Sequence, residues 1–166
     1  VRSRGLGDVY KRQMVFDTEM YSNTGGQASK ASNIGEVCQF AAAGKEMKKK
    51  SLAEIAMSYG YVYVAQIALG ANPAQAVKCI AEAEAYPGPS LIIGYAPCEL
   101  HGIAKGGMNH CQDEMKKAVK SGYWNLFSFD PAKKEAGKNP FTLTSKEGDG
   151  TYQVFLHNES RYTRLV

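Results

Sequence analysis

The sequence predicts an α/β fold with a parallel sheet. Short apolar segments rich in β-branched and aromatic residues alternate with segments of helical periodicity. Such alternation is typical of strands joined by crossover helices, which lie parallel in one sheet. The length of 166 residues, with 44% hydrophobic and 22% charged residues, suits one globular core.

The first strand is predicted at residues 14–16, an apolar run that ends at Asp17 and has the composition of a buried parallel strand. Residues 18–32 are polar and small and contain Gly25 and Gly26, which predicts a loop after this strand. Ligands bind at the carboxyl ends of parallel strands. This loop is therefore the first candidate site.

Residues 51–54 form a capping box and predict the start of a helix. The apolar face of this helix is predicted to consist of Leu52, Ile55 and Ala56. After the glycine that ends it, residues 61–65 have the aromatic and β-branched content of a strand. Residues 66–69 suit a strand or a helix equally well.

Asn72 and Pro73 predict the start of the next helix, because asparagine caps helices and proline fits their first turn. Its apolar residues at helical spacing are Val77, Ile80 and Ala81. Residues 90–95 then predict an apolar strand, whose end leads Cys98 into a second candidate loop. A glycine-rich segment precedes a predicted helix at about residues 112–120.

The two ends differ from residues 14–129, which form the predicted domain. Residues 1–13 hold four basic residues and one acidic residue without a hydrophobic period, and are interpreted as a translated sequencing adapter, a non-native leader. A targeting peptide is the alternative, because the segment is basic. Residues 130–166 are rich in Pro, Gly, Lys and Ser and predict an irregular C-terminal extension that wraps a neighbouring domain or subunit.

Composition excludes two classes of partner. Without the leader the net charge falls from +4 to +1, so no broad basic surface for nucleic acid is expected. No apolar stretch approaches the roughly 18–20 residues that span a bilayer, and no secretory signal is present. The chain is expected to be cytoplasmic, with no nucleic-acid and no membrane partner.

The first candidate loop has the donor groups of a cation and phosphate site. Residues 17–27 gather a carboxylate, threonine and serine hydroxyls, an asparagine amide and two glycines. Hydroxyl, amide and backbone carbonyl oxygens are ligands for Mg²⁺, and glycines allow backbone amides to approach phosphate. By composition alone, an ordinary polar turn fits the segment as well.

Five segments closely resemble the pyruvate:ferredoxin (flavodoxin) oxidoreductase family. They are DTEMYSNTGGQ at 17–27, FAAAGK at 40–45, AMSYGYVYVA at 56–65, YPGPSLIIGYAPC at 86–98 and GYW at 122–124. The resemblance runs from Met14 to about Val166 and corresponds to the C-terminal half of a thiamine diphosphate-binding domain and the start of its tail. It implies oxidation of pyruvate with coenzyme A to acetyl-CoA and CO2, with electrons passed through iron–sulfur clusters to ferredoxin or flavodoxin.

The resemblance implies roles for residues of both loops. Thr18 would supply a side-chain oxygen and Met20 a backbone carbonyl to Mg²⁺, which bridges the diphosphate. Asn23 would contact the diphosphate and border the reacting centre as the catalytic residue. Cys98 would complete a four-iron four-sulfur cluster near the thiamine. The implied cofactor-binding residues are Thr18, Met20, Ser22, Asn23 and Thr24.

The chain departs from the family pattern upstream of these loops. The family's thiamine motif begins with Gly-Asp-Gly, whose aspartate is a third Mg²⁺ ligand, and its cluster uses a CxxC pair and one further upstream cysteine. None of these precedes Asn23, and the GDG at 148–150 lies downstream, in the wrong chain order. The chain is therefore expected to be inactive alone, as a fragment of an enzyme that is a homodimer when intact.

Two other interpretations stay open. A thiamine-dependent ferredoxin oxidoreductase of another 2-oxoacid would share these motifs, because the residues that recognise pyruvate lie largely elsewhere. A non-catalytic α/β binding module, or an incorrect reading frame, would lack the upstream Gly-Asp-Gly and CxxC altogether.

The remaining polar candidates are expected to have no catalytic role. His101 and His110 flank the second loop and would suit acid–base chemistry, but loop histidines are more often solvated. The lysines at 48–50 are expected to form a solvated face, with contact to coenzyme A or an acidic ferredoxin as the alternative. The cysteines expected to be free thiols are Cys38, Cys79 and Cys111.

Overall fold

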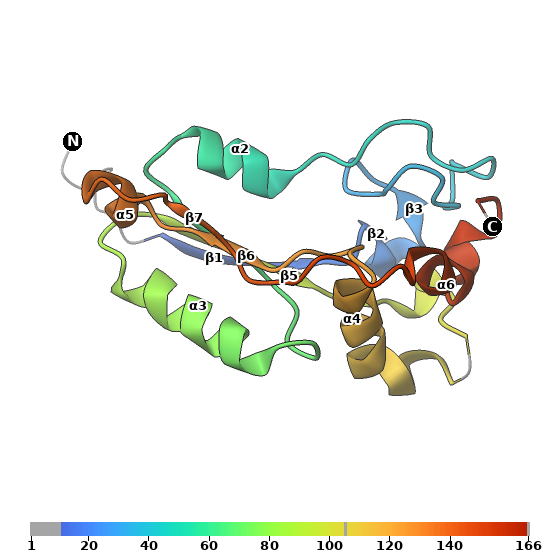
Figure 1. The fold of residues 1–166 in the computed structure, drawn as a ribbon. Helices are drawn as coiled ribbons and strands as arrows, with labels where there is room; N and C mark the ends of the chain where they lie inside the picture. Colours follow the sequence, from blue (N-terminus) through green and yellow to red (C-terminus); the bar gives the residue numbers. More distant parts are fainter. Residues whose placement is uncertain (1–10, 105, 166) are drawn as a thin grey trace.

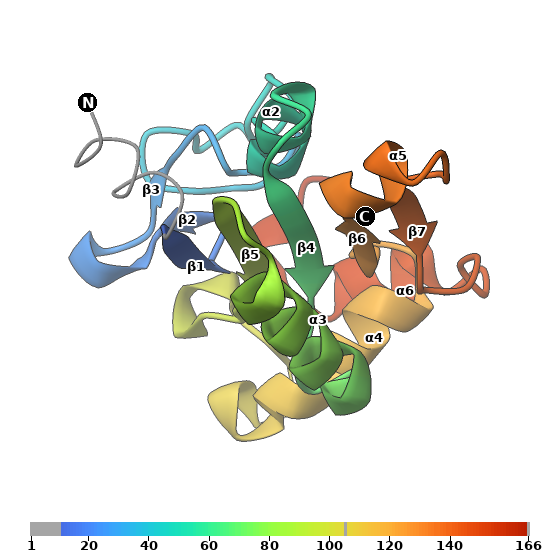
Figure 2. The same cartoon turned by 90° about the vertical axis from the view of Figure 1, so that its left-hand side faces the viewer.

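The fold is built on a five-stranded sheet with the order β1-β5-β4-β6-β7, which is visible from left to right in Figure 2. The computed structural model describes residues 11–104 and 106–165. The parallel half contains β1 (Arg12–Asp17), β5 (Ser90–Tyr95) and β4 (Tyr63–Ile67). The antiparallel half contains β6 (Phe127–Phe129) and β7 (Phe141–Leu143). The predicted α/β fold with a parallel sheet is confirmed, and two antiparallel strands that the sequence did not predict extend it.

Helices cover both faces of this sheet (Figure 1): α2 (Leu52–Ser58) lies on one side and α3 (Pro73–Ala85) on the other. Neighbouring residues of a strand point to opposite faces. Accordingly, Val64 of β4 packs in the core cluster of α2, whereas Ala65 packs in the core cluster of α3. The other helices are α4 (Cys111–Lys120), α5 (Pro131–Glu135) and α6 (Tyr152–His157). Among the described residues, no helix is both long and apolar enough to cross a membrane.

The helix starts predicted at Ser51 and Asn72 are confirmed. Of the predicted apolar faces, Ala56 is buried as expected, but the larger residues are not. The Ser51 hydroxyl accepts a hydrogen bond from the Glu54 amide at 3.1 Å, and the Asn72 side chain accepts one from the Gln75 amide at 2.9 Å. The residues that face the sheet are small, namely Ala53 and Ala56 of α2 and Ala76, Cys79 and Ala83 of α3. The larger apolar residues are exposed, namely Leu52, Ile55, Val77 and Ile80. Small side chains let each helix lie close against the sheet, so the larger residues point outward.

The strand predictions need corrections. The strand predicted at residues 61–65 is β4, which begins only at Tyr63. Gln66 and Ile67 belong to β4, so the strand interpretation of that segment is confirmed and the helical one is wrong for these two residues. β1 is not a buried strand: it lies at the edge of the sheet, and Phe16 is 70% exposed. β1 also begins at Arg12, inside the predicted leader. Residues 1–10 of that leader lie outside the described residues.

The C-terminal extension is more regular than predicted. Besides α5, β7 and α6, it contains the short 3-10 helix η4 (Ser160–Tyr162). Its β7 pairs with β6 of the sheet, so this part of the extension packs on the chain's own domain. Its last part reaches the loops at the carboxyl end of β1, where the Val37 amide donates to the Arg161 carbonyl at 2.7 Å.

Candidate functional site

The two candidate loops start side by side, at the carboxyl ends of two neighbouring strands. β1 and β5 are parallel neighbours, and Asp17 at the end of one is paired with Tyr95 at the end of the other. The Ala96 amide donates to the Asp17 carbonyl at 3.1 Å and extends this pairing by one residue. Thr18 and Cys98 therefore follow adjacent strands at the carboxyl end of the sheet, where ligands bind in parallel sheets.

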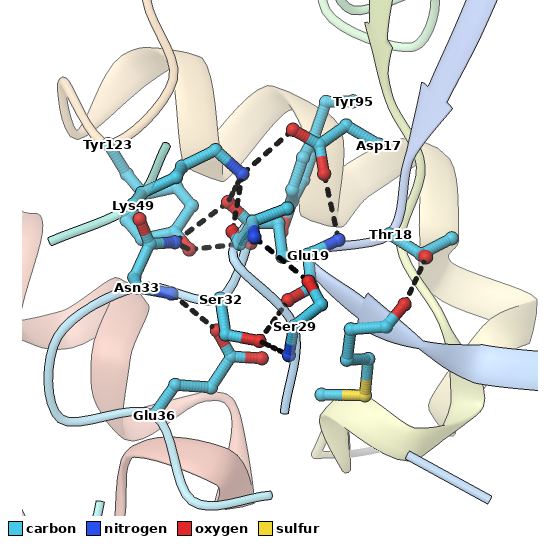
Figure 3. A network of polar contacts seen from close by, with 12 residues as sticks. Asp17, Thr18, Glu19, Ser29, Ser32, Asn33, Glu36, Lys49, Tyr95 and Tyr123 are labelled. Atoms are coloured by element: carbon cyan, nitrogen blue, oxygen red, sulfur yellow. Dashed lines mark hydrogen bonds and ion pairs between the residues drawn. The ribbon is translucent and has the colours of Figure 1, made fainter. Parts of the chain in front are cut away.

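The first loop turns sharply at Glu19. This residue has a φ of 61°, in the left-handed region that non-glycine residues rarely adopt. Because of this turn, an oxygen of Thr18 and an oxygen of Met20 lie close together. The Thr18 hydroxyl donates to the Met20 carbonyl at 2.9 Å (Figure 3). The Glu19 side chain points the other way, into the protein, and is 2% exposed.

Thr18 and Met20 present the oxygens that suit a magnesium ion. Mg²⁺ binds oxygens at about 2.0–2.1 Å in octahedral geometry, so two adjacent ligand oxygens lie about 2.9 Å apart. The Thr18 hydroxyl and the Met20 carbonyl oxygen have this separation. Among the described residues, no group of three His, Cys, Asp or Glu side chains forms an alternative metal site. The oxygen types and their convergence suit Mg²⁺, which would take the place of the hydrogen bond that joins them in this structure.

The segment after Met20 folds back as a small hairpin. β2 (Met20–Tyr21) pairs with β3 (Gln27–Ala28), and the 3-10 helix η1 (Ser22–Thr24) lies between them. Asn23 and Thr24 are exposed on η1, and Ser22 is half-buried. Thr24 exchanges hydrogen bonds with the Gln27 side chain at 2.6 and 2.8 Å. The fold thus keeps the five predicted cofactor-binding residues on one short loop.

Cys98 lies in the second loop and is 9% exposed. Its sulfur accepts a hydrogen bond from the Leu100 amide at 3.4 Å, and amide hydrogen bonds to sulfur are one of the features that tune iron–sulfur centres. The Leu100 side chain packs on Gly26 of the first loop: a Cβ added there would lie 3.2 Å from a Leu100 methyl. The two loops are therefore in contact.

His101 links the two loops through both of its ring nitrogens. It ends the 3-10 helix η2 (Glu99–His101) and is fully buried. Nε2 lies 2.8 Å from the Thr18 carbonyl oxygen, and Nδ1 lies 3.4 Å from the Cys98 amide nitrogen. A carbonyl only accepts and an amide only donates, so Nε2 carries the proton and Nδ1 accepts. Burial lowers the pKa of His101 to about 4, which keeps the ring neutral.

The prediction of a solvated His101 is therefore wrong, whereas the one for His110 is confirmed by a side chain that is 51% exposed. The lysine prediction is also wrong for Lys49. Its ammonium lies 2.7 Å from an Asp17 carboxylate oxygen and 3.5 Å from Glu19. The free-thiol prediction is confirmed, with Cys38 and Cys79 buried and Cys111 half-buried.

The Glu19 side chain is held in place by a buried network of polar side chains (Figure 3). Its carboxylate is 2.8 Å from the Arg161 guanidinium and accepts hydrogen bonds from Tyr123 at 2.6 Å and from Asn33 at 2.8 Å. Burial by itself raises the pKa of Glu19, but Arg161 and Lys49 outweigh it and hold this pKa at about 2. Glu19 is therefore ionised at neutral pH.

Arg161 is shared among three buried carboxylates. Besides Glu19, it contacts Glu36 at 3.2 Å and Glu159 at 2.6 Å. Burial raises the pKa of Glu159 to about 7, although Arg161 opposes the increase. The pKa of Glu36 is also raised by burial. One guanidinium thus joins the C-terminal extension to the segment that carries the first loop.

Sequence reasoning missed most of this network. Glu19 and Tyr123 lie within segments that carried the family resemblance, but the resemblance assigned no role to either residue. Arg161 and Glu159 lie in a segment predicted to be irregular, and nothing in its composition indicates burial. The role of Arg161 depends on contacts with Glu36 and Glu19, which lie more than a hundred positions away in the chain.

Comparison with known proteins finds close relatives of this chain, although no family model matches it. It is 55% identical over 152 residues to the pyruvate-flavodoxin oxidoreductase of Enterobacter agglomerans and, equally, to the pyruvate:ferredoxin oxidoreductase of Moorella thermoacetica. It is 53% identical to the mitochondrial pyruvate dehydrogenase [NADP(+)] of Euglena gracilis. Each alignment covers 92% of this chain, but only 13% of the first two relatives and 8% of the third.

Proposed function

Since the chain belongs to the family of pyruvate:ferredoxin and pyruvate-flavodoxin oxidoreductases, we propose that it forms part of an enzyme that oxidises pyruvate. The proposed reaction uses coenzyme A, yields acetyl-CoA and CO2, and passes electrons to ferredoxin or flavodoxin. The observation that carries the proposal is the 2.9 Å separation of the Thr18 hydroxyl and the Met20 carbonyl at the carboxyl end of β1. It supports a Mg²⁺ site of the kind that anchors a diphosphate.

In this proposal, the first loop binds the diphosphate end of thiamine diphosphate. Thr18 and Met20 hold Mg²⁺, and Asn23, exposed on η1, reaches the diphosphate. Ser22 and Thr24 belong to the same segment, and the hydrogen bonds between Thr24 and Gln27 fix its shape. When bound, thiamine diphosphate supplies the electron sink for decarboxylation.

Cys98 is proposed to supply one thiolate to a four-iron four-sulfur cluster. Iron–sulfur clusters are held by cysteine thiolates, which are soft ligands. The amide of Leu100 donates to the Cys98 sulfur, which stabilises negative charge on it. The contact of Leu100 with Gly26 supports a position for this sulfur next to the diphosphate loop.

The proposal leaves two candidates for the electron acceptor. The Euglena gracilis relative, whose name specifies NADP(+), is almost as similar to this chain as the two whose names specify flavodoxin and ferredoxin. The segment represented by this chain is therefore common to proteins with different acceptors. An enzyme that passes its electrons on to NADP(+) is the second candidate.

The test is a hybrid enzyme, in which this chain replaces the homologous segment of the Moorella thermoacetica relative. The readouts are coenzyme A-dependent reduction of a viologen dye by pyruvate and the affinity for Mn²⁺, a paramagnetic substitute for Mg²⁺, in the presence of thiamine diphosphate. Thr18→Val removes one ligand oxygen. Loss of a residue that only supports a metal ligand typically lowers metal affinity 10–100-fold, so we expect the loss of a ligand to lower Mn²⁺ affinity by at least about 10-fold. Thr18→Ser keeps a hydroxyl and should retain most of it. Unchanged affinity in Thr18→Val would contradict the proposal.

A further inference from the structure

His101 lies between the two loops and contacts the backbone of each one next to a proposed ligand residue. The carbonyl that it contacts belongs to the peptide between Thr18 and Glu19, and that peptide leads into the left-handed turn. The amide that it contacts belongs to Cys98 itself. One rigid ring therefore connects the backbone that sets the Thr18–Met20 separation to the backbone that carries the Cys98 sulfur.

The ring cannot easily turn or leave this position. It is fully buried, and the C-terminal extension lies against it: a carboxylate oxygen of Glu159 is 3.8 Å from Nδ1. The Ser160 amide donates to the Gly102 carbonyl at 3.0 Å, and the Ala104 amide donates to the Asn158 carbonyl at 2.8 Å. These contacts fix the segment that follows His101 against the C-terminal extension.

We propose that His101 is a positioning residue that holds the proposed Mg²⁺ loop and the proposed cluster ligand Cys98 in a fixed relation, through the Thr18 carbonyl and the Cys98 amide. The inference rests on the proposed function, because it assigns cofactors to both loops. Supporting contacts of this kind orient metal ligands, and their loss typically lowers metal affinity or activity 10–100-fold. In this proposal His101 acts through these two backbone groups.

The two ring nitrogens can be tested separately with amide side chains. Asparagine places an oxygen near the position of Nδ1, so His101→Asn keeps an acceptor for the Cys98 amide and loses the donor to Thr18. Glutamine places an amide nitrogen near the position of Nε2, so His101→Gln keeps the donor to Thr18 and loses the acceptor. His101→Phe removes both, and His110→Gln is the matched control, because His110 is exposed.

In the hybrid enzyme, the two variants should fail in different ways. We expect His101→Asn to lower Mn²⁺ affinity about 10–100-fold and to leave the electron paramagnetic resonance spectrum of the reduced cluster unchanged. We expect His101→Gln to keep the affinity within about twofold and to change that spectrum. Loss of folding would affect both readouts in both variants. Equal effects of the two variants, or none, would overturn the inference.

A measurement on the 166-residue chain without cofactors tests the geometry itself. Nitrogen-15 NMR of His101 should show a protonated Nε2 and an unprotonated Nδ1 at neutral pH. The opposite tautomer or a doubly protonated ring would overturn the inference. The two proposals fail distinguishably: if Thr18→Val leaves Mn²⁺ affinity unchanged, the proposed function is wrong, and if Thr18→Val lowers it but His101→Asn does not, only the role of His101 is wrong.

Discussion

The candidate site and the outer faces of the helices differ in which side chains are buried. The site lies at the carboxyl end of the sheet. At this end, polar side chains are buried and have several partners each, as Glu19 has with Arg161, Tyr123 and Asn33. On the helices, large apolar residues such as Ile55 and Val77 face solvent while alanines are buried. Burial of charge usually costs stability, so its concentration at one loop indicates that this loop needs a fixed shape.

Contacts with the buried network and with Asp17 hold residues 18–20 in the conformation that we propose binds the cation. Glu19 is fixed by its side chain in the network and by its amide, which donates to Asp17 at 2.9 Å. The oxygens of Thr18 and Met20 then converge as a consequence. Supporting contacts of this kind reduce the reorganisation that ligand binding requires.

The largest expected effect follows from removal of Arg161. Arg161→Met leaves Glu19, Glu36 and Glu159 buried without their shared cation. Breaking a buried ion pair costs about 3–5 kcal/mol, so thermal unfolding should shift down by roughly 10 °C. Arg164→Met, at an exposed position of the same segment, is the control. Equal melting temperatures of the two variants would show that the network does not support the fold.

The second prediction tests the helix side of the comparison. Ala56 is 8% exposed against the sheet, whereas its neighbour Ile55 is 41% exposed. Ala56→Leu should lower the free energy of unfolding by about 1–3 kcal/mol, because the contact has no room for a larger side chain. Ile55→Ser should change it by no more than about 0.5 kcal/mol. Urea denaturation measures both, and the reverse order would mean that the helix packs through its large residues.

The third prediction concerns pH and Glu159. Its folded-state pKa is raised to about 7 from 4.5, so its contribution to stability is fully present below pH 4.5 and is lost as pH rises through 7. The charged and titratable groups that act on it or contact it are Arg161 on η4, Tyr95 on β5, His101 on η2, Glu114 on α4 and Glu19 of the first loop.

Glu159→Gln cannot ionise, so it should gain stability relative to the natural chain between pH 5 and pH 8, by on the order of 1–3 kcal/mol. The measurement is the free energy of unfolding of both chains at the two pH values. A constant difference between them would mean that Glu159 titrates normally.

The smallest effect is expected on the outer face of α3. Val77 is 65% exposed and Ile80 is 44% exposed. Val77→Ser and Ile80→Ser should each change the free energy of unfolding by no more than about 0.5 kcal/mol. Ala76→Ser, at a fully buried position of the same helix, is the contrasting variant and should cost more. Equal losses would indicate that the outer face is packed in solution.

The sequence was a good guide where the signal is local. The caps at Ser51 and Asn72, the strand at residues 90–95 and the loop after Asp17 all follow from short patterns, and the structure has each of them. The buried helix faces did not follow, because helical periodicity identifies a face of large apolar residues without stating what covers it.

The candidate site was predictable only in part. The resemblance indicated Thr18, Met20 and Cys98, and the structure brings the first two together. His101 and Arg161 carry no local pattern, since their burial depends on contacts with distant segments. The left-handed turn at Glu19 was equally invisible, because glutamate has no preference for it.

Hydrogen exchange of the Glu19 amide, in the 166-residue chain without divalent cations, tests directly whether the protein alone forms the turn at residues 18–20. This amide donates to the buried Asp17 carboxylate, so its protection reports the turn between Thr18 and Met20. We expect slow exchange in the presence of a chelator and little change when Mg²⁺ is added. Exchange at the rate of an unstructured loop, slowed only by Mg²⁺, would contradict it, because the cation rather than the protein would then form the turn.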